Sequence, residues 1–191
     1  MFIRFNKVRP ARFEETPAQS SPRPPPGSGA NLPSLPVARD AMVDAMTLEL
    51  GVCYYPEQCE RGHWREDARR MADLGLDWVR LAEFSWASVE RRRGCFTWDW
   101  LDEVIGILGE AGLKVMMCTP TAAPPKWLVD EHPDILPVGP DGRTRGFGAR
   151  RHYCFSSRTY LAEACRIATE YARRYGQNPH VQAWQIDNEY G

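Results

Sequence analysis

The sequence predicts an α/β fold in which strands and helices alternate along the chain. Apolar stretches long enough for buried strands are separated by segments whose apolar residues recur at helical spacing. The predicted strands are residues 48–55, 76–84, 113–120 and 180–187, and the predicted helices are residues 63–75, 100–112 and 160–176. A glycine follows each helix, where it can end the helix in the left-handed conformation: Gly75, Gly112 and Gly176.

These repeats of helix, glycine, short turn and strand form about four β/α units, and such units predict parallel strands. Four units make the first half of a (β/α)8 TIM barrel, which is the predicted fold. An open four-stranded parallel sheet is the competing architecture. In a barrel, the chemistry lies at the carboxyl ends of the strands.

Each helix has a predicted buried face. The first is expected to bury Trp64, Ala68 and Met71, which share one side of residues 63–75. The stripe of the second helix consists of Leu101, Val104, Ile105, Leu108 and Ala111. The stripe of the third helix consists of Leu161, Ala164, Cys165, Ala168 and Ala172. These stripes have the spacing expected of helices that pack against a sheet.

The first 46 residues differ in composition from the rest. They hold eight of the sixteen prolines and none of the seven tryptophans. Such a segment buries too little apolar surface to offset its ordering entropy. We predict a disordered tail over 1–46, with a proline-rich ligand for a partner module as the alternative, and one folded domain over 47–191.

Charge and cysteine content exclude several classes of function. The formal net charge of −1 gives no overall field that would favour nucleic acid or an anionic membrane. No apolar run approaches the ~18 residues of a membrane helix. The start of the chain makes a poor secretory signal, and the six scattered cysteines favour reduced thiols, so we expect a cytoplasmic protein.

Polar residues follow each predicted strand, in "CYYPEQ", "RLAEFSW", "TPTAAPPKW" and "DNEYG". Glu189, at the end of an apolar strand, is a candidate acid: partial desolvation would raise the pKa of its carboxyl so that it could protonate a leaving oxygen. The alternative is a carboxylate that caps the next helix. Asn188 could bind a hydroxyl of a bound sugar or merely stabilise a turn.

Three further side chains suit either a site or the core. Arg80 lies inside an apolar strand and is expected to pair with a carboxylate, either in the site or as a structural ion pair. Trp86 and Trp127 could be stacking platforms or core residues. The long segment 142–157 is rich in Gly and Arg and supplies donors at Arg150, Arg151 and His152, which predicts a functional loop.

Five motifs carry a family resemblance. "GVCYYPEQ", "ARRMADLGLDWVRLAEFSW", "TPTAAPPKWLVDEHPDILPV", "GFGARRHYCFSS" and "WQIDNEYG" resemble, in this order, the N-terminal part of the glycoside hydrolase family 42 β-galactosidases. The resemblance implies a TIM barrel that hydrolyses terminal β-galactosides with retention and needs no cofactor for the chemistry. It implies Glu189 as the acid/base and Asn188 and Arg150 as galactose-binding residues. Cys154 matches the first of four cysteines that bind a structural zinc in some members.

The resemblance also shows what residues 48–191 do not contain. The family's nucleophilic carboxylate and the other three zinc cysteines belong to later segments. A retaining mechanism needs two carboxyls roughly 5–5.5 Å apart. We therefore expect a truncated β-galactosidase that is inactive alone and is compatible with a homo-oligomer when full-length. The alternatives are a non-catalytic sugar-binding or assembly module that needs a complementing C-terminal half, and another barrel glycosidase of different specificity.

Overall fold

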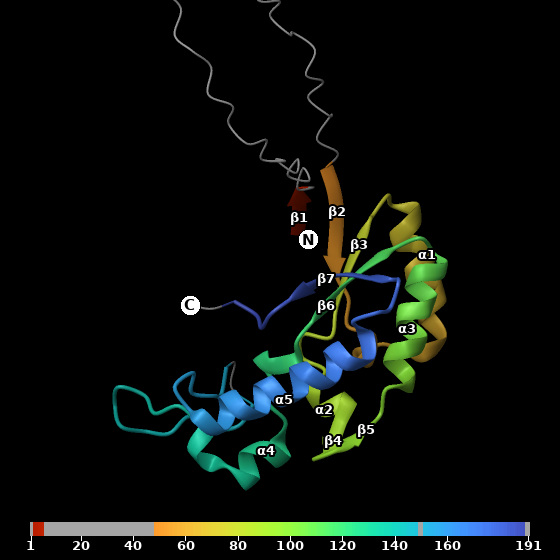
Figure 1. Ribbon diagram of the computed structural model, residues 1–191. Helices are drawn as coiled ribbons and strands as arrows, with labels where there is room; N and C mark the ends of the chain where they lie inside the picture. The colour runs from red at the N-terminus through yellow and green to blue at the C-terminus, as the bar shows by residue number, and fades with distance from the viewer. Residues whose placement is uncertain (1, 6–47, 149–150, 190–191) are drawn as a thin grey trace, which may run out of the picture. The chain divides into compact units, whose positions relative to one another are not determined.

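The computed structural model describes residues 2–5, 48–148 and 151–189 (Figure 1). The chain divides into two compact units, one of Met1–Arg4 with Glu49–Gly191 and one of Phe5–Leu48. Apart from Phe5 and Leu48, every described residue belongs to the first unit. The predicted boundary near residue 46 lies outside the described residues, as does most of the predicted disordered tail.

The central element is a parallel sheet. Strands β2 (Leu48–Cys53), β3 (Trp78–Leu81), β6 (Lys114–Cys118) and β7 (Val181–Gln185) are the four predicted strands, each a few residues shorter than expected. They lie in the order β2-β3-β6-β7, and each neighbouring pair is parallel. The α/β class and the parallel arrangement are therefore confirmed. Because neighbours in sequence are neighbours in the sheet, the order is also that of a barrel.

One strand lies where the sequence predicted disorder. Phe2–Phe5 forms β1, which occupies the edge of the sheet beside β2. These four residues belong to the segment predicted to be a disordered tail, and that prediction stays a prediction for the segment as a whole. The free edge of a sheet presents unpaired backbone groups that can accept a short apolar strand, and residues 2–5 supply such a strand.

Helices connect the parallel strands, as crossovers in such sheets must. They are α1 (Trp64–Asp73), α3 (Asp99–Glu110) and α5 (Arg158–Tyr175), and Figure 1 shows α1 and α3 side by side. The predicted faces of α1 and α3 are buried except for Ala111, which directly follows α3 and is only partly buried. Gly75 and Gly112 end their helices with φ of 74° and 80°, as predicted.

The predicted face of α5 is wrong. The helix buries Tyr160, Glu163, Ile167, Tyr171 and Tyr175, a stripe rotated by about one residue from the predicted one. Leu161, at the start of the predicted stripe, is 59% exposed. The tyrosine rings bury far more apolar surface than the alanines of the predicted stripe could, and they set the orientation of the helix.

Gly176 also differs from the prediction. Its φ is −63°, so it does not adopt the left-handed conformation expected at the end of α5. A Cβ at this position would lie 2.5 Å from the carbonyl oxygen of Ala172, to which the Gly176 amide donates. Glycine is therefore needed here for close backbone approach instead of for a positive φ.

Several short elements were not predicted because they are too short to show periodicity. They are α2 (Trp86–Val89), the hairpin of β4 (Glu90–Arg92) and β5 (Cys95–Phe96), and α4 (Lys126–Glu131). In the described part of the chain, four 3-10 turns cover Pro56–Gln58, Arg61–His63, Pro120–Ala122 and Pro133–Ile135. Within the described residues, no helix is both long enough and apolar enough to span a bilayer.

Candidate active site

The carboxyl ends of β2 and β3 carry a closed polar cluster. Arg80 points from β3 and forms an ion pair with Glu83, which is only 3% exposed. The Tyr55 hydroxyl donates to Glu83 Oε1 over 3.2 Å. Burial and the neighbouring Glu83 charge raise the pKa of Tyr55, so this hydroxyl stays protonated. The predicted pairing of Arg80 with a carboxylate is thus confirmed.

A glutamine joins this cluster to the far end of the sheet. Arg80 Nη1 donates to Gln185 Oε1 over 2.9 Å, across the intervening strand β6. Gln185 Nε2 donates to the backbone oxygen of Asp187 over 2.9 Å and to Asn188 Oδ1 over 3.3 Å. Sequence reasoning did not identify Gln185. A polar residue inside an apolar strand is the signal that identified Arg80, and it applied equally here.

Asp187 fixes the turn after β7. Its backbone amide donates to Thr119 Oγ1 over 2.8 Å, and its carboxylate accepts from the Tyr153 hydroxyl and from the Asn188 amide. The side chain is buried and satisfied by these donors. Asp187 and Tyr153 were not among the predicted site residues, although Asp187 directly precedes Asn188.

Asn188 is held in a defined orientation. It is 6% exposed, its Oδ1 accepts from Gln185, and its backbone oxygen accepts from Arg151 Nη2 over 2.7 Å. Within the described residues, no protein acceptor contacts its Nδ2 group. The amide can therefore still donate to a ligand.

Glu189 is exposed, whereas Asp187 and Asn188, the two residues before it, are buried. The expected partial desolvation of this carboxyl is therefore wrong for the described part of the chain. The reason is its position, because β7 is an edge strand and no further strand beyond it is described. Its φ of 46° places the backbone in the left-handed region.

Backbone strain is concentrated near the carboxyl ends of the strands. Ala82, Arg151, Asp187 and Glu189 are the non-glycine residues of the described part with positive φ. Ala82 separates Arg80 from Glu83, and its φ of 73° turns the chain so that the two side chains meet. Such strain costs about 1–3 kcal/mol per residue and tends to be kept at functional sites.

The loop 142–157 contributes donors only in part. Arg151 binds the Asn188 backbone, and His152 is buried with its Nε2 3.0 Å from the Pro124 oxygen. Both side chains contact backbone, which indicates that they support the loop. Arg150, the predicted galactose-binding residue of this loop, lies outside the described residues.

The described residues do not fit a zinc site. Cys154 has a half-buried thiol, and its backbone amide donates to the Ile135 oxygen over 2.7 Å. No group of three or more His, Cys, Asp or Glu side chains in 2–5, 48–148 or 151–189 could hold a metal. A structural zinc needs four ligands, so Cys154 as a zinc ligand stays a prediction.

The two tryptophans belong to the core side of the α2–β4 region. Trp86 is fully buried and donates from Nε1 to Glu90 Oε2 over 2.9 Å. Trp127 donates to the Glu90 backbone oxygen, and the Arg93 guanidinium lies over its ring at 5.5 Å. Both indole N–H groups thus bind protein acceptors, which favours the packing interpretation over sugar-stacking platforms.

Fold and site together define a class. Parallel strands joined by helices, with the polar side chains gathered at the strand carboxyl ends, are the arrangement of enzymes built on (β/α) barrels.

A family model described as beta-galactosidase, glycoside hydrolase family 42, matches residues 53–191. The beta-galactosidase BgaA of Thermus sp. is 56% identical over 142 residues, and Bga of Halorubrum lacusprofundi is 51% identical over 144 residues. The crystal structure of the beta-galactosidase from the psychrophilic Marinomonas ef1 has a TM-score of 0.73 at 53% identity and covers 75% of this chain. The chain belongs to the β-galactosidases of glycoside hydrolase family 42, and its sheet is the first half of their TIM barrel.

The matched region is most of this chain but a small part of its relatives. It covers 74% of this chain and 22% of the Thermus sp. protein, and 75% of this chain and 21% of the Halorubrum lacusprofundi protein. The matched Marinomonas ef1 structure is covered over 22% of its chain. The chain therefore spans about a fifth of the length of these relatives.

Proposed function

We propose that this chain carries the acid/base half of a retaining β-galactosidase site. Glu189 is the proton donor, and Asn188 and Arg150 bind the galactose. The observation that carries the proposal is the fixed Asn188 amide: Gln185 and the Asp187 turn hold it beside Glu189 with its Nδ2 group available to a ligand hydroxyl. The substrate class is a terminal β-galactoside, which the names of the relatives support.

The proposed chemistry requires two carboxyls. Glu189 protonates the glycosidic oxygen while a second carboxylate attacks the anomeric carbon, and Glu189 then removes a proton from the water that hydrolyses the glycosyl-enzyme. Glu83 and Asp187 are the buried carboxylates that follow β3 and β7, and both accept hydrogen bonds from protein donors. In the described residues, neither is available as the nucleophile.

We therefore propose that the 191-residue chain alone hydrolyses nitrophenyl β-galactoside no faster than a heat-denatured control. General acid catalysis alone contributes typically about 10²–10⁴-fold, well below the roughly 10⁶-fold or greater acceleration of enzymes. Turnover by the purified chain that disappears in Glu189→Ala would contradict this. A zinc at Cys154, a cytoplasmic location and a homo-oligomer of the whole protein stay predictions.

The role of Glu189 is tested by placing residues 53–191 in the Thermus sp. relative in place of the matching segment. The chimera is expected to hydrolyse nitrophenyl β-galactoside, and Glu189→Ala should lower kcat by about 10²–10⁴-fold. Nitrophenolate leaves without protonation, so the variant stalls as the glycosyl-enzyme, and azide, which needs no general base, should restore turnover. Glu189→Gln provides an isosteric second variant. A loss of activity that azide does not rescue would contradict an acid/base role.

A further inference from the structure

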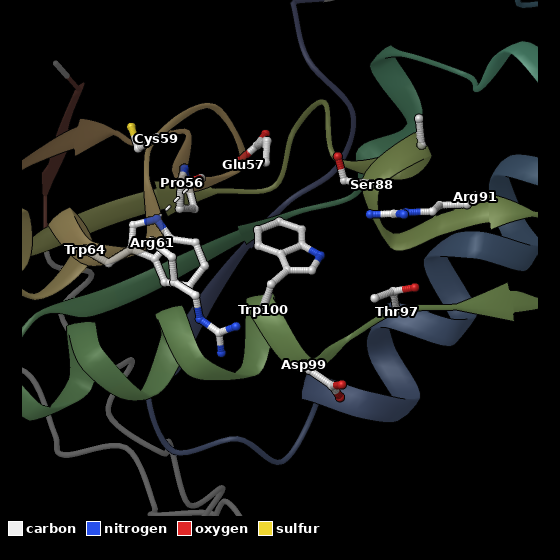
Figure 2. A pocket seen from close by; sticks show the side chains of 11 residues that line it. Pro56, Glu57, Cys59, Arg61, Trp64, Ser88, Arg91, Thr97, Asp99 and Trp100 are labelled. Atoms are coloured by element: carbon white, nitrogen blue, oxygen red, sulfur yellow. Dashed lines mark hydrogen bonds between the residues drawn. The ribbon is translucent and has the colours of Figure 1, made fainter.

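Two carboxylates near the carboxyl ends of the strands differ in how completely they are hydrogen-bonded. Glu57 follows β2 and lies in the wall of a cavity of ≈ 560 Å³ (Figure 2). Its Oε1 accepts from Ser85 Oγ over 3.1 Å, but its buried Oε2 has no protein partner in the described part of the chain. Asp187 follows β7, and both of its carboxylate oxygens accept hydrogen bonds. The Asp187 carboxylate is therefore the more firmly held of the two.

Tyr153 is the side chain that holds the Asp187 carboxylate. Its hydroxyl donates from a position 3.2 Å from Asp187 Oδ1 and 3.2 Å from Asp187 Oδ2. Asp187 Oδ1 also accepts from the backbone amide of Asn188 over 2.6 Å. Among the described residues, no other side chain donates to these two oxygens. A buried carboxylate depends on such donors, because burial removes the water that would otherwise bind it.

The Tyr153 ring is itself fixed by packing. The residue is 2% exposed, and its ring stacks on Tyr160 with the ring centroids 4.2 Å apart. Tyr160 belongs to α5, and its own hydroxyl donates to the Thr121 backbone oxygen. The Phe155 ring meets the Tyr153 ring edge-on, with the centroids 5.1 Å apart. The hydroxyl thus reaches Asp187 from a ring whose position is set by α5 and by the loop before it.

The turn that Asp187 begins is strained. Asp187 has a φ of 55° and Glu189 a φ of 46°, so two of three consecutive residues are in the left-handed region. Such residues persist only where the surrounding contacts hold them. Two contacts from other segments hold Asp187: its amide donates to Thr119 Oγ1, and its carboxylate accepts from Tyr153. Loss of the Tyr153 hydroxyl would therefore loosen the turn that places Asn188 and Glu189.

The loop 142–157 contacts this turn twice. Tyr153 donates to the Asp187 carboxylate, and Arg151 Nη2 donates to the Asn188 backbone oxygen over 2.7 Å. The two donors are two residues apart in the loop, and they bind adjacent residues of the turn. The loop thus supports the turn through a side-chain acceptor and a backbone acceptor together.

We propose that Tyr153 is a positioning residue for the acid/base. Its hydroxyl acts through the Asp187 carboxylate and sets where the Glu189 carboxyl lies against the bound galactoside. Tyr153 does not touch the substrate, so its contribution comes from geometry alone. This inference rests on the proposed function, because it assigns Tyr153 a role through Glu189. Its physical basis is that displacing a catalytic group by about 1 Å can lower the rate by about a hundredfold.

The first test measures the turn in the 191-residue chain by amide hydrogen exchange and NMR. Tyr153→Phe keeps the stacked ring and removes only the hydroxyl. The Asn188 amide should exchange about tenfold faster in this variant, because the turn opens more often. Tyr160→Phe is the matched control, since it removes a buried hydroxyl from the same ring pair and no contact of Asp187. Unchanged exchange in Tyr153→Phe, or an equal rise in both variants, would overturn the proposal.

The second test measures catalysis in the chimera that carries residues 53–191 in the Thermus sp. relative. Phenolate needs a proton to leave and dinitrophenolate does not, so the ratio of kcat/KM for phenyl β-galactoside to kcat/KM for dinitrophenyl β-galactoside reports general acid catalysis. Tyr153→Phe should lower this ratio about tenfold. Tyr160→Phe should leave the ratio within about twofold of the parent. A purely structural role would lower both kcat/KM values alike, and that result would contradict the positioning role.

The Glu189→Ala chimera separates this inference from the proposed function. Its ratio is already low, and adding Tyr153→Phe should lower the ratio no further, because Tyr153 acts through Glu189. A further fall in the double variant would mean that Tyr153 acts elsewhere, and the inference would fail. If Glu189→Ala lowers the ratio but Tyr153→Phe does not, the inference fails and the proposed function stands. If Glu189→Ala leaves the ratio unchanged, the proposed function fails first.

Discussion

A glutamate follows β3 and another follows β7, and the two side chains differ in how far they are buried. At β3, the Arg80 and Glu83 charges face each other and Tyr55 closes the cluster, so the carboxylate is almost inaccessible. At β7, Asp187 and Asn188 are buried and bonded, but Glu189 is exposed. The first carboxylate is enclosed by its own protein, whereas the second is exposed to solvent. Carboxylates at equivalent strand ends can therefore have different roles.

Strand β6 lies between these two regions, and its last residue gives the largest expected effect. Burial raises the pKa of the Cys118 thiol to about 12. The thiolate fraction rises about tenfold per pH unit below the pKa, so at pH 8 we expect Cys118 to react with a disulfide reagent roughly a thousandfold more slowly than an ordinary thiol. The exposed Cys59, Cys95 and Cys165 are the internal reference.

Counting released thionitrobenzoate over time, before and after urea, measures the difference. Cys118→Ser identifies the slow thiol in the trace. Rapid reaction of Cys118 in the folded chain would show that its thiol is accessible, and it would contradict this prediction.

Removal of each carboxylate tests the comparison directly. Glu83→Ala leaves Arg80 without its ion-pair partner in a largely buried position, and it should lower the free energy of unfolding by about 3 kcal/mol. Glu189→Ala removes an exposed side chain and should change it by less than about 0.5 kcal/mol. Urea denaturation followed by tryptophan fluorescence gives both values. Equal effects of the two substitutions would contradict the distinction drawn here.

The smallest expected effect concerns the helix next to β7. Leu161 lies on the exposed face of α5, so Leu161→Ala should change stability by less than about 0.5 kcal/mol. The buried Ile167 on the same helix is the matched control, because Ile167→Ala should cost about 2–5 kcal/mol. Thermal melts of the two variants would settle which face of α5 is buried. A larger cost at Leu161 would restore the face that the sequence predicted.

Much of the fold could be predicted because regular spacing carries it. The four parallel strands and the faces of α1 and α3 follow from apolar periodicity, which responds to burial alone. The face of α5 could not be predicted in the same way. Tyr171 and Tyr175 are amphipathic, and they pack edge-on against Trp98, a contact that depends on a residue far away in sequence.

The site could be predicted in part for the same reason. Arg80 stands out because a lone charge in an apolar strand needs a partner, and its partner was found. The turn at Asp187 could not be derived, since its left-handed backbone depends on Thr119 and Tyr153 from two other segments. The exposure of Glu189 depends on what lies beyond the edge strand β7, which local sequence does not encode.

The Gln185 side chain has a consequence for how the whole edge moves. Its oxygen faces a cation from β3, and its nitrogen faces two oxygens after β7, so only one of the two flipped amide orientations is satisfied. The Gln185 amide therefore links Arg80 on β3 to the turn after β7, across β6, in a single orientation. If β7 shifted along β6, Gln185 would move with it and Arg80 would lose this acceptor. The ends of the edge strand and of β3 are therefore mechanically coupled through a single uncharged side chain.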